Sequence, residues 1–298
     1  MTPAAGHPHL SRIHAGNGHS ACNVRPAHFI SQPMPPVLDR KAVVVIGGTS
    51  GLGLSAARAC VRAGGSVVVV GRNPETASAA ALSLGNAAAS LSGDAADATI
   101  AEQAIALAVE RFGNFHGLYH VAGGSGRRQG DGPLHELTEE GWDHTLNHNL
   151  SSVAWSNRAA VRQFLRQGTG GSVLNCGSVL GSSPSPRFFS THAYAAAKAA
   201  ITGLTRSAAA YYAPQGIRFN VVAPGLVATP MSERAQANDA IMHFIRTKQP
   251  LDGGRIGQPE DLDAAVVWLL SDEARFVTGQ EIAIDGGWSV SEGQISRT

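Results

Sequence analysis

Short runs of β-branched and other apolar residues alternate with segments of helical character along most of this chain. Examples are AVVVI at 42–46, SVVVV at 66–70, GSVLNC at 171–176 and, later, IRFNVVAPG and QEIAIDGG. Continuous apolar runs of this length are typical of strands buried on both faces, as in parallel sheets that helices cover on either side. Seven such strands predict an α/β fold, a doubly wound, seven-stranded parallel sheet with helices on both faces.

The first run leads into a glycine-rich loop, GGTSGLG at 47–53, and then into a helical segment. Its glycines let the backbone turn sharply and approach a pyrophosphate with no Cβ in the way. The helix that follows offers free N–H groups and a positive dipole end to the same phosphates. Many such loops are ordinary turns, but the strand before it and the helix after it favour a Rossmann-type dinucleotide site.

Charge, hydropathy and cysteine content exclude several classes of protein. The 298 residues carry a formal net charge of +1, which gives no electrostatic reason to bind nucleic acid or an anionic membrane. The apolar runs are far shorter than the roughly 20 residues of a membrane-spanning helix. Cys22, Cys60 and Cys176 are odd in number and lack metal-ligand spacing. We therefore expect reduced thiols, no metal site and a cytoplasmic protein.

Residues 1–38 differ in composition from the rest of the chain. They hold five of the twelve histidines and no acidic residue, and they show neither a helical nor a strand period. Such a segment does not bury enough apolar surface to offset its ordering entropy. We expect a disordered N-terminal extension over 1–38 and a single domain over 39–298, with Met34 as an alternative start. A histidine metal site in the extension is disfavoured because the segment lacks a rigid frame.

The stretch THAYAAAKAA at 191–200 is a helix whose alanines leave only a few side chains for chemistry. Tyr194 and Lys198 are four residues apart, so they lie on one face of that helix. An unperturbed phenol has a pKa of about 10, and a nearby cation favours the phenolate. A buried ring beside a solvated charge is the alternative reading of this pair.

The Gly-x-x-x-Gly-x-Gly spacing of the loop, together with Tyr194-x-x-x-Lys198, resembles the short-chain dehydrogenase/reductase family in its compact single-domain branch. Further landmarks of that family follow in order between about residues 40 and 290: Asp94, an Ala-Gly at 122–123, WDHTLNHNL, GSVLNCGS, NVVAPGLVATPM and GRIGQPEDL. Each piece is modest evidence by itself, whereas the ordered set is very specific.

The resemblance implies a role for four residues at the reacting centre. Tyr194 matches the general acid/base, and Lys198 matches the lysine that binds the nicotinamide ribose. Ser178, at the end of a strand, matches the serine that hydrogen-bonds the substrate oxygen; a turn-forming serine is the alternative. Asn149 matches the asparagine that holds a water between the lysine and solvent.

The resemblance also implies a set of cofactor contacts along the strand ends. Besides Tyr194 and Lys198, these are Gly47, Thr49, Ser50, Gly51, Leu52, Gly53, Arg72, Asp94, Ala122, Gly123, Pro224, Gly225, Val227 and Thr229.

The end of the second strand bears on the choice of cofactor. An NAD site of this fold carries a carboxylate there, which accepts hydrogen bonds from the ribose 2′-hydroxyl. Here the strand ends in Gly71-Arg72-Asn73, and no carboxylate appears before Glu75. Gly71 leaves room for a 2′-phosphate, and Arg72 offers it a planar fork of charged donors. The sequence therefore favours NADP over NAD, although an arginine in an exposed turn is the alternative.

Two departures from the family pattern are interpreted as structural variation. The usual threonine before the first glycine is Ile46, and the usual Asn-Asn-Ala-Gly is His120-Val121-Ala122-Gly123. We expect His120 to be a hydrogen-bonded core residue. The substrate pocket is expected between 124–137, 183–189 and 226–252, and the arginines at 127 and 128 are interpreted as solvated.

The function predicted is an NADP-linked oxidoreductase that interconverts a ketone and a secondary alcohol. An epimerase or dehydratase that recycles its cofactor is an alternative, disfavoured by the glycine spacing and the short C-terminal region. A non-catalytic nucleotide-sensing module is another, and it need not keep Ser178, Tyr194 and Lys198 together. The expected partners are a small carbonyl or alcohol substrate and further copies of the chain, in a homotetramer or homodimer.

Overall fold

The computed structural model describes residues 36–293, in which seven strands form one sheet. The strands are β1 (Ala42–Ile46), β2 (Ser66–Gly71), β3 (Ala88–Ser92), β4 (Gly117–His120), β5 (Gly171–Cys176), β6 (Ile217–Pro224) and β7 (Glu281–Ile284). Their order is β3-β2-β1-β4-β5-β6-β7, and every neighbouring pair is parallel. The predicted doubly wound parallel sheet is confirmed.

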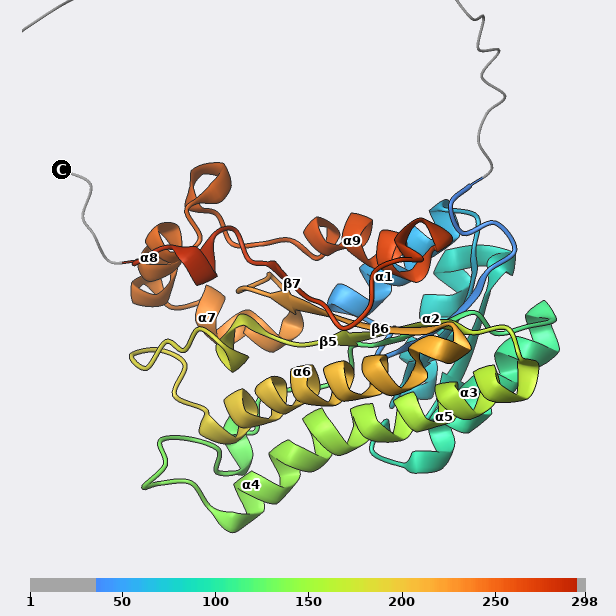
Figure 1. The fold of residues 1–298 in the computed structure, drawn as a ribbon. Coiled ribbons are helices and arrows are strands. Elements are labelled where there is room, and N and C mark those ends of the chain that lie inside the picture. The colour runs from blue at the N-terminus through green and yellow to red at the C-terminus, as the bar shows by residue number, and fades with distance from the viewer. Residues whose placement is uncertain (1–35, 294–298) are drawn as a thin grey trace, which may run out of the picture. The chain divides into compact units, whose positions relative to one another are not determined.

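Helices cover both faces of this sheet (Figure 1). One face carries α1 (Gly51–Arg62), α2 (Pro74–Leu84) and α9 (Asp263–Leu270). The other carries α3 (Ala98–Phe112), α5 (Ser152–Gln167) and α6 (His192–Tyr212). Helix α4 (Glu139–Leu146) continues into α5 through a π-helical turn at Asn147–Ser151, and the short α7 (Glu233–Gln236) and α8 (Asp239–Lys248) follow β6.

The apolar run of β1 shows why the strands have no polar face. Val43 and Val45 belong to the core cluster shared with α1, α2 and α9. Val44 and Ile46 belong to the cluster shared with α3 and α5. Because successive side chains of a strand point to opposite faces, a strand between two helical layers needs an apolar residue at every position.

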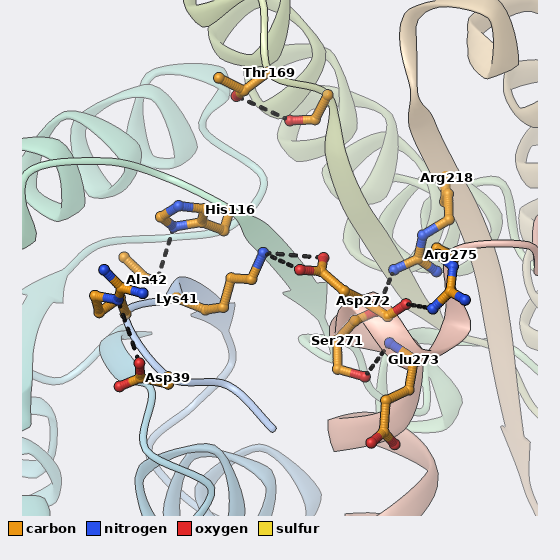
Figure 2. Close-up of polar contacts among 12 residues, drawn as sticks. Asp39, Lys41, Ala42, His116, Thr169, Arg218, Ser271, Asp272, Glu273 and Arg275 are labelled. Carbon is orange, nitrogen blue, oxygen red and sulfur yellow. Dashed lines mark hydrogen bonds and ion pairs between the residues drawn. The ribbon is translucent and has the colours of Figure 1, made fainter. Parts of the chain in front are cut away.

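Hydrogen bonds and an ion pair close the amino-terminal edge of the sheet (Figure 2). Lys41 Nζ lies 2.8 Å from a carboxylate oxygen of Asp272. Arg218 donates to the carbonyls of Leu269 and Ser271, each at 2.9 Å, so it satisfies acceptors at the carboxyl end of α9. These contacts hold the edge opposite to the carboxyl ends of the strands.

The described residues begin within the segment expected to be an extension. Leu38 is fully buried in the first core cluster, and its N–H donates to the carbonyl of Ala63 at 2.9 Å. The packed part of the chain therefore starts before the predicted boundary at 39, because Leu38 fills a site beside α1. Residues 1–35 of the expected extension, with Cys22 and Met34, lie outside the described residues. Within 36–293, no helix is long and apolar enough to cross a membrane.

Candidate active site

A cavity of ≈ 290 Å³ lies along the carboxyl ends of the strands, where ligands bind in open α/β sheets. It is lined by every residue that the sequence analysis assigned to cofactor contact, from Gly47 to Thr229, and by Ser178, Tyr194 and Lys198. Asn149 does not line the cavity. The structure thus brings all the sequence-predicted site residues except Asn149 to one cleft.

At one end of the cleft, Gly47 and Gly53 of the glycine loop have no room for a side chain. Gly47 has φ +89°, and a Cβ there would lie 2.6 Å from the backbone nitrogen of Ala122. A Cβ on Gly53 would lie 2.0 Å from the carbonyl oxygen of Gly47. Helix α1 starts at Gly51, and the first residues of its first turn, Gly51, Leu52 and Gly53, line this end of the cleft. A backbone cradle followed at once by a helix start fits a pyrophosphate.

The second strand ends beside this loop. A Cβ on Gly71 would lie 2.5 Å from the Thr49 side chain, so the glycine is needed for the approach of the loop. Arg72 is exposed, lines the cleft and has no ion-pair partner among residues 36–293. Asp94 also lines the cleft, and its carboxylate accepts a hydrogen bond from the N–H of Ala96 at 2.9 Å.

Three side chains form the other end of the cleft. Ser178 directly follows β5 and Gly177, while Tyr194 and Lys198 lie on α6. All three are buried, with 7%, 8% and 4% of their surface exposed. Lys198 Nζ lies 5.6 Å from the ring centroid of Tyr194 and donates to the carbonyl of Cys176 at 2.8 Å. The shared helical face expected for Tyr194 and Lys198 is therefore present.

Burial dominates the electrostatics of this end. It raises the pKa of Tyr194 above its ordinary value, Cys176 raises it further, and a hydrogen bond with Ser178 lowers it. Burial also lowers the pKa of Lys198, which Cys176 opposes. In the chain alone, desolvation disfavours the charged forms of both groups, so a phenolate at Tyr194 would need the positive charge of the oxidised nicotinamide in addition to that of Lys198.

Asn149 lies behind the cleft wall, in the π-helical turn between α4 and α5. Its Oδ1 accepts from the N–H of Gly124 at 3.0 Å, and its Nδ2 donates to the carbonyls of Gly124 and Thr145, both at 2.9 Å. A Cβ on Gly123 would lie 2.7 Å from Asn149 Oδ1 and 3.6 Å from Lys198 Nζ. Asn149 therefore fixes the start of the loop after β4, next to the lysine. Asn147, two residues earlier, is exposed.

Two histidines occupy this region, and sequence reasoning missed one of them. His120 is buried and its ring contacts the hydroxyls of Ser156 at 2.7 Å and Ser152 at 3.3 Å, so it is the hydrogen-bonded core residue that was expected. Burial lowers its pKa to about 3. His148 lines the cleft, and its pKa is lowered by burial and then by Arg72. The one signal in the sequence that could have pointed to His148 as a cleft residue is its position directly before Asn149.

Known proteins resemble this chain over most of its length. The family model described as enoyl-(acyl carrier protein) reductase matches residues 47–289. A short-chain type dehydrogenase/reductase from Mycobacterium ulcerans superposes with a TM-score of 0.79 at 30% identity, covering 86% of this chain and 92% of that one. The chain belongs to the short-chain dehydrogenase/reductase family.

Relatives within this family carry the names of alcohol dehydrogenases. The 2-(S)-hydroxypropyl-CoM dehydrogenase 3 of Xanthobacter autotrophicus is 37% identical over 259 residues, which cover 84% of this chain and 97% of the relative. The cyclohexanol dehydrogenase of an Acinetobacter strain is 35% identical over 255 residues, covering 84% and 96%. As a member of the family, the protein is an NAD(P)-dependent oxidoreductase that acts on CH–OH or C=O groups.

Proposed function

We propose that the protein interconverts a ketone and a secondary alcohol with NADP(H), and that Tyr194 is its general acid/base. The observation that carries this proposal is the meeting of Ser178, Tyr194 and Lys198 at one end of a cleft whose other end is a glycine-loop cradle. Cyclohexanol, in the name of one relative, is a secondary alcohol, which supports the substrate class.

Each buried side chain has a part in the proton transfer. When bound, the nicotinamide donates or accepts the hydride, and its oxidised form adds a positive charge to the cleft. Ser178 hydrogen-bonds the substrate oxygen, and Tyr194 donates a proton to that oxygen in reduction and accepts one in oxidation. Burial raises the pKa of Tyr194 away from neutral pH, where a general acid/base works best, so the positive charges of Lys198 and of the oxidised nicotinamide would have to lower it together. Lys198 binds the ribose, and Asn149 orders a water that links the lysine to solvent.

The choice of NADP rests on Arg72. Arg72 is an exposed guanidinium at the cleft, with no ion pair among the residues described. The nearest acidic residue along the chain, Glu75, instead accepts a hydrogen bond from Asn73 at 3.0 Å and does not line the cleft. A 2′-phosphate therefore meets an available fork of donors and no carboxylate from this turn.

We also propose that the protein is a cytoplasmic homotetramer. Cys60 and Cys176 are buried free thiols, which suits a reducing compartment. Trp142 on α4, Leu165 on α5 and Tyr211 on α6 leave 40%, 50% and 72% of their surface exposed. Association through these helices would cover those side chains. Light scattering at micromolar concentration tests this assembly, and a monomer alone would contradict it.

The test of the proposed activity is a spectrophotometric screen. Cyclic and linear secondary alcohols are offered with NADP and with NAD, and the matching ketones with the reduced cofactors. We expect turnover of at least one alcohol–ketone pair, with a higher kcat/KM for NADP. Failure of every pair with both cofactors, in a protein that still binds NADP, would contradict the proposed reaction.

A further inference from the structure

The helix that carries Tyr194 has an unusual cap. Thr191 occupies the N-cap position of α6, but its side chain makes no capping hydrogen bond. The carboxylate of Asp131 accepts instead from the N–H of Ala193 through Oδ1 and from the N–H of Tyr194 through Oδ2, both at 3.0 Å. The first turn of α6 is thus capped by a residue more than sixty positions earlier in the chain, in the loop after β4.

Asp131 suits this task because it is buried and held in place. Only 2% of its surface is exposed, and no cation is paired with it among residues 36–293. The positive end of the helix dipole and two N–H groups therefore compensate the carboxylate. The backbone assists, since the N–H of His192 donates to the carbonyl of Gly132 at 3.4 Å.

The loop that carries Asp131 is fixed on its other side by α4. The N–H of Asp131 donates to the carbonyl of Gly126 at 3.1 Å. A Cβ on Gly126 would lie 1.7 Å from Thr145 Oγ1, so this part of the loop packs directly against α4. The same loop starts at Gly124, which Asn149 binds at both its N–H and its carbonyl. The loop thus connects the helix of Asn149 to the first turn of the helix of Tyr194.

We infer that Asp131 is a positioning residue for the reaction: its carboxylate fixes the backbone of Tyr194 and thereby the phenol relative to Ser178. This inference rests on the proposed acid/base role of Tyr194. Displacing a reacting group by about 1 Å can cost about 100-fold in rate. The cofactor contacts of the glycine loop lie at the other end of the cleft, and Lys198 lies a full turn beyond the capped N–H groups, so we expect the loss to fall on kcat more than on cofactor binding.

The test compares two carboxylates that accept from the first turn of a helix, the buried Asp131 at α6 and the exposed Asp97 at α3. Asp131→Ala removes the cap of α6, and Asp97→Ala removes the cap of α3, where Asp97 accepts from the N–H of Thr99 at 2.8 Å. Thermal unfolding, kcat, and the dissociation constant for NADP are measured for both. We expect both variants to be less stable, but only Asp131→Ala to lose about 10- to 100-fold in kcat, with its NADP dissociation constant changed by less than about twofold.

Asp131→Asn is the second variant, because it keeps one acceptor oxygen. Its kcat is expected between those of the wild type and Asp131→Ala. Amide hydrogen exchange of Ala193 and Tyr194 gives a readout that does not depend on turnover, and we expect faster exchange in both Asp131 variants but not in Asp97→Ala. Equal kcat in the wild type and the Asp131 variants, or unchanged exchange at these two amides, would overturn the inference. An inactive wild type would instead overturn the proposed function.

Discussion

The two ends of the cleft achieve their geometry by opposite means. At the glycine-loop end, backbone packs against backbone, and a Cβ on Gly53 would lie 2.0 Å from the carbonyl oxygen of Gly47. At the reacting end, Ser178, Tyr194 and Lys198 are side chains removed from water, with shifted pKa values for the latter two. The first end is therefore governed by sterics and the second by desolvation and hydrogen bonding. Substitutions at the first end should weaken cofactor binding, whereas substitutions at the second should lower turnover.

The largest effect on cofactor binding is expected from Gly53→Ala. The added methyl group must push residue 53 and the start of α1 away from Gly47, because the obstacle is backbone and not a flexible side chain. Overpacking typically costs about 1–3 kcal/mol, and we place this case at the upper end. The dissociation constant for NADP, measured by fluorescence titration, should then rise by up to about 150-fold.

The matched control for that variant is Gly203→Ala. Gly203 lies inside α6, where a Cβ would meet nothing within 4 Å. NADP affinity should stay unchanged there, and stability should rise slightly, since alanine is the better helix former. Equal affinity in the Gly53 and Gly203 variants would show that the close packing of the loop does not shape the cofactor site.

Arg72→Ala should have a narrower effect, confined to the choice between cofactors. A charge-assisted hydrogen bond contributes about 1.5–3 kcal/mol, so the preference for NADP should fall by roughly 10- to 150-fold, while kcat/KM with NAD is spared. Arg58→Ala removes another exposed arginine, on α1 and outside the cleft, and should change neither cofactor. A wild type that prefers NAD, or an Arg72 variant that loses both cofactors equally, would refute the assignment.

The parts of the molecule that could be predicted from the sequence depend on local spacing. The burial of both faces of β1 follows from the run AVVVI, and the shared face of Tyr194 and Lys198 follows from four residues of helix. The glycine loop could be recognised because the strand, the turn and the helix of such a site follow one another directly in the sequence. The expected core role of His120 was confirmed by its contacts with Ser156 and Ser152.

The rest depends on contacts between distant segments, which no local pattern encodes. Nothing in the sequence distinguishes Asp131 from the other residues of its polar loop. Only the three-dimensional path of that loop brings its carboxylate to the first turn of α6. The room at Gly71 was expected to serve a phosphate, whereas the Thr49 side chain fills it. The burial that raises the pKa of Tyr194 could not be predicted for the same reason, because it is a property of the assembled core.

The smallest effect expected is a pH dependence of the unfolding free energy that arises from the buried His120 on β4. Unfolded histidine has a pKa of about 6.5, whereas burial lowers the pKa of folded His120 to about 3. Between these values the unfolded chain binds the additional proton, so the contribution to stability is present above about pH 6.5 and is lost as pH falls. The slope is about 1.4 kcal/mol per pH unit, or about 2 kcal/mol between about pH 6 and 4.5.

His120→Asn removes this titration. Urea unfolding of the wild type and the variant at several pH values should give curves of unfolding free energy that converge as pH falls. Parallel curves would show that His120 takes up its proton as readily in the folded chain as in the unfolded one.

The central claim is that the glycine-loop end of the cleft binds the cofactor and the other end transfers the proton. It is tested most directly on Tyr194→Phe, by measuring cofactor binding and turnover on the same preparation. The variant keeps the ring and the glycine loop but loses the hydroxyl that exchanges the proton. We expect the NADP dissociation constant to stay within about threefold of the wild-type value, since the cradle is intact. Removing a general acid/base typically costs about 10²–10⁴-fold, and kcat should fall at least that far. Retention of more than about a third of kcat, or loss of NADP binding together with turnover, would contradict the account.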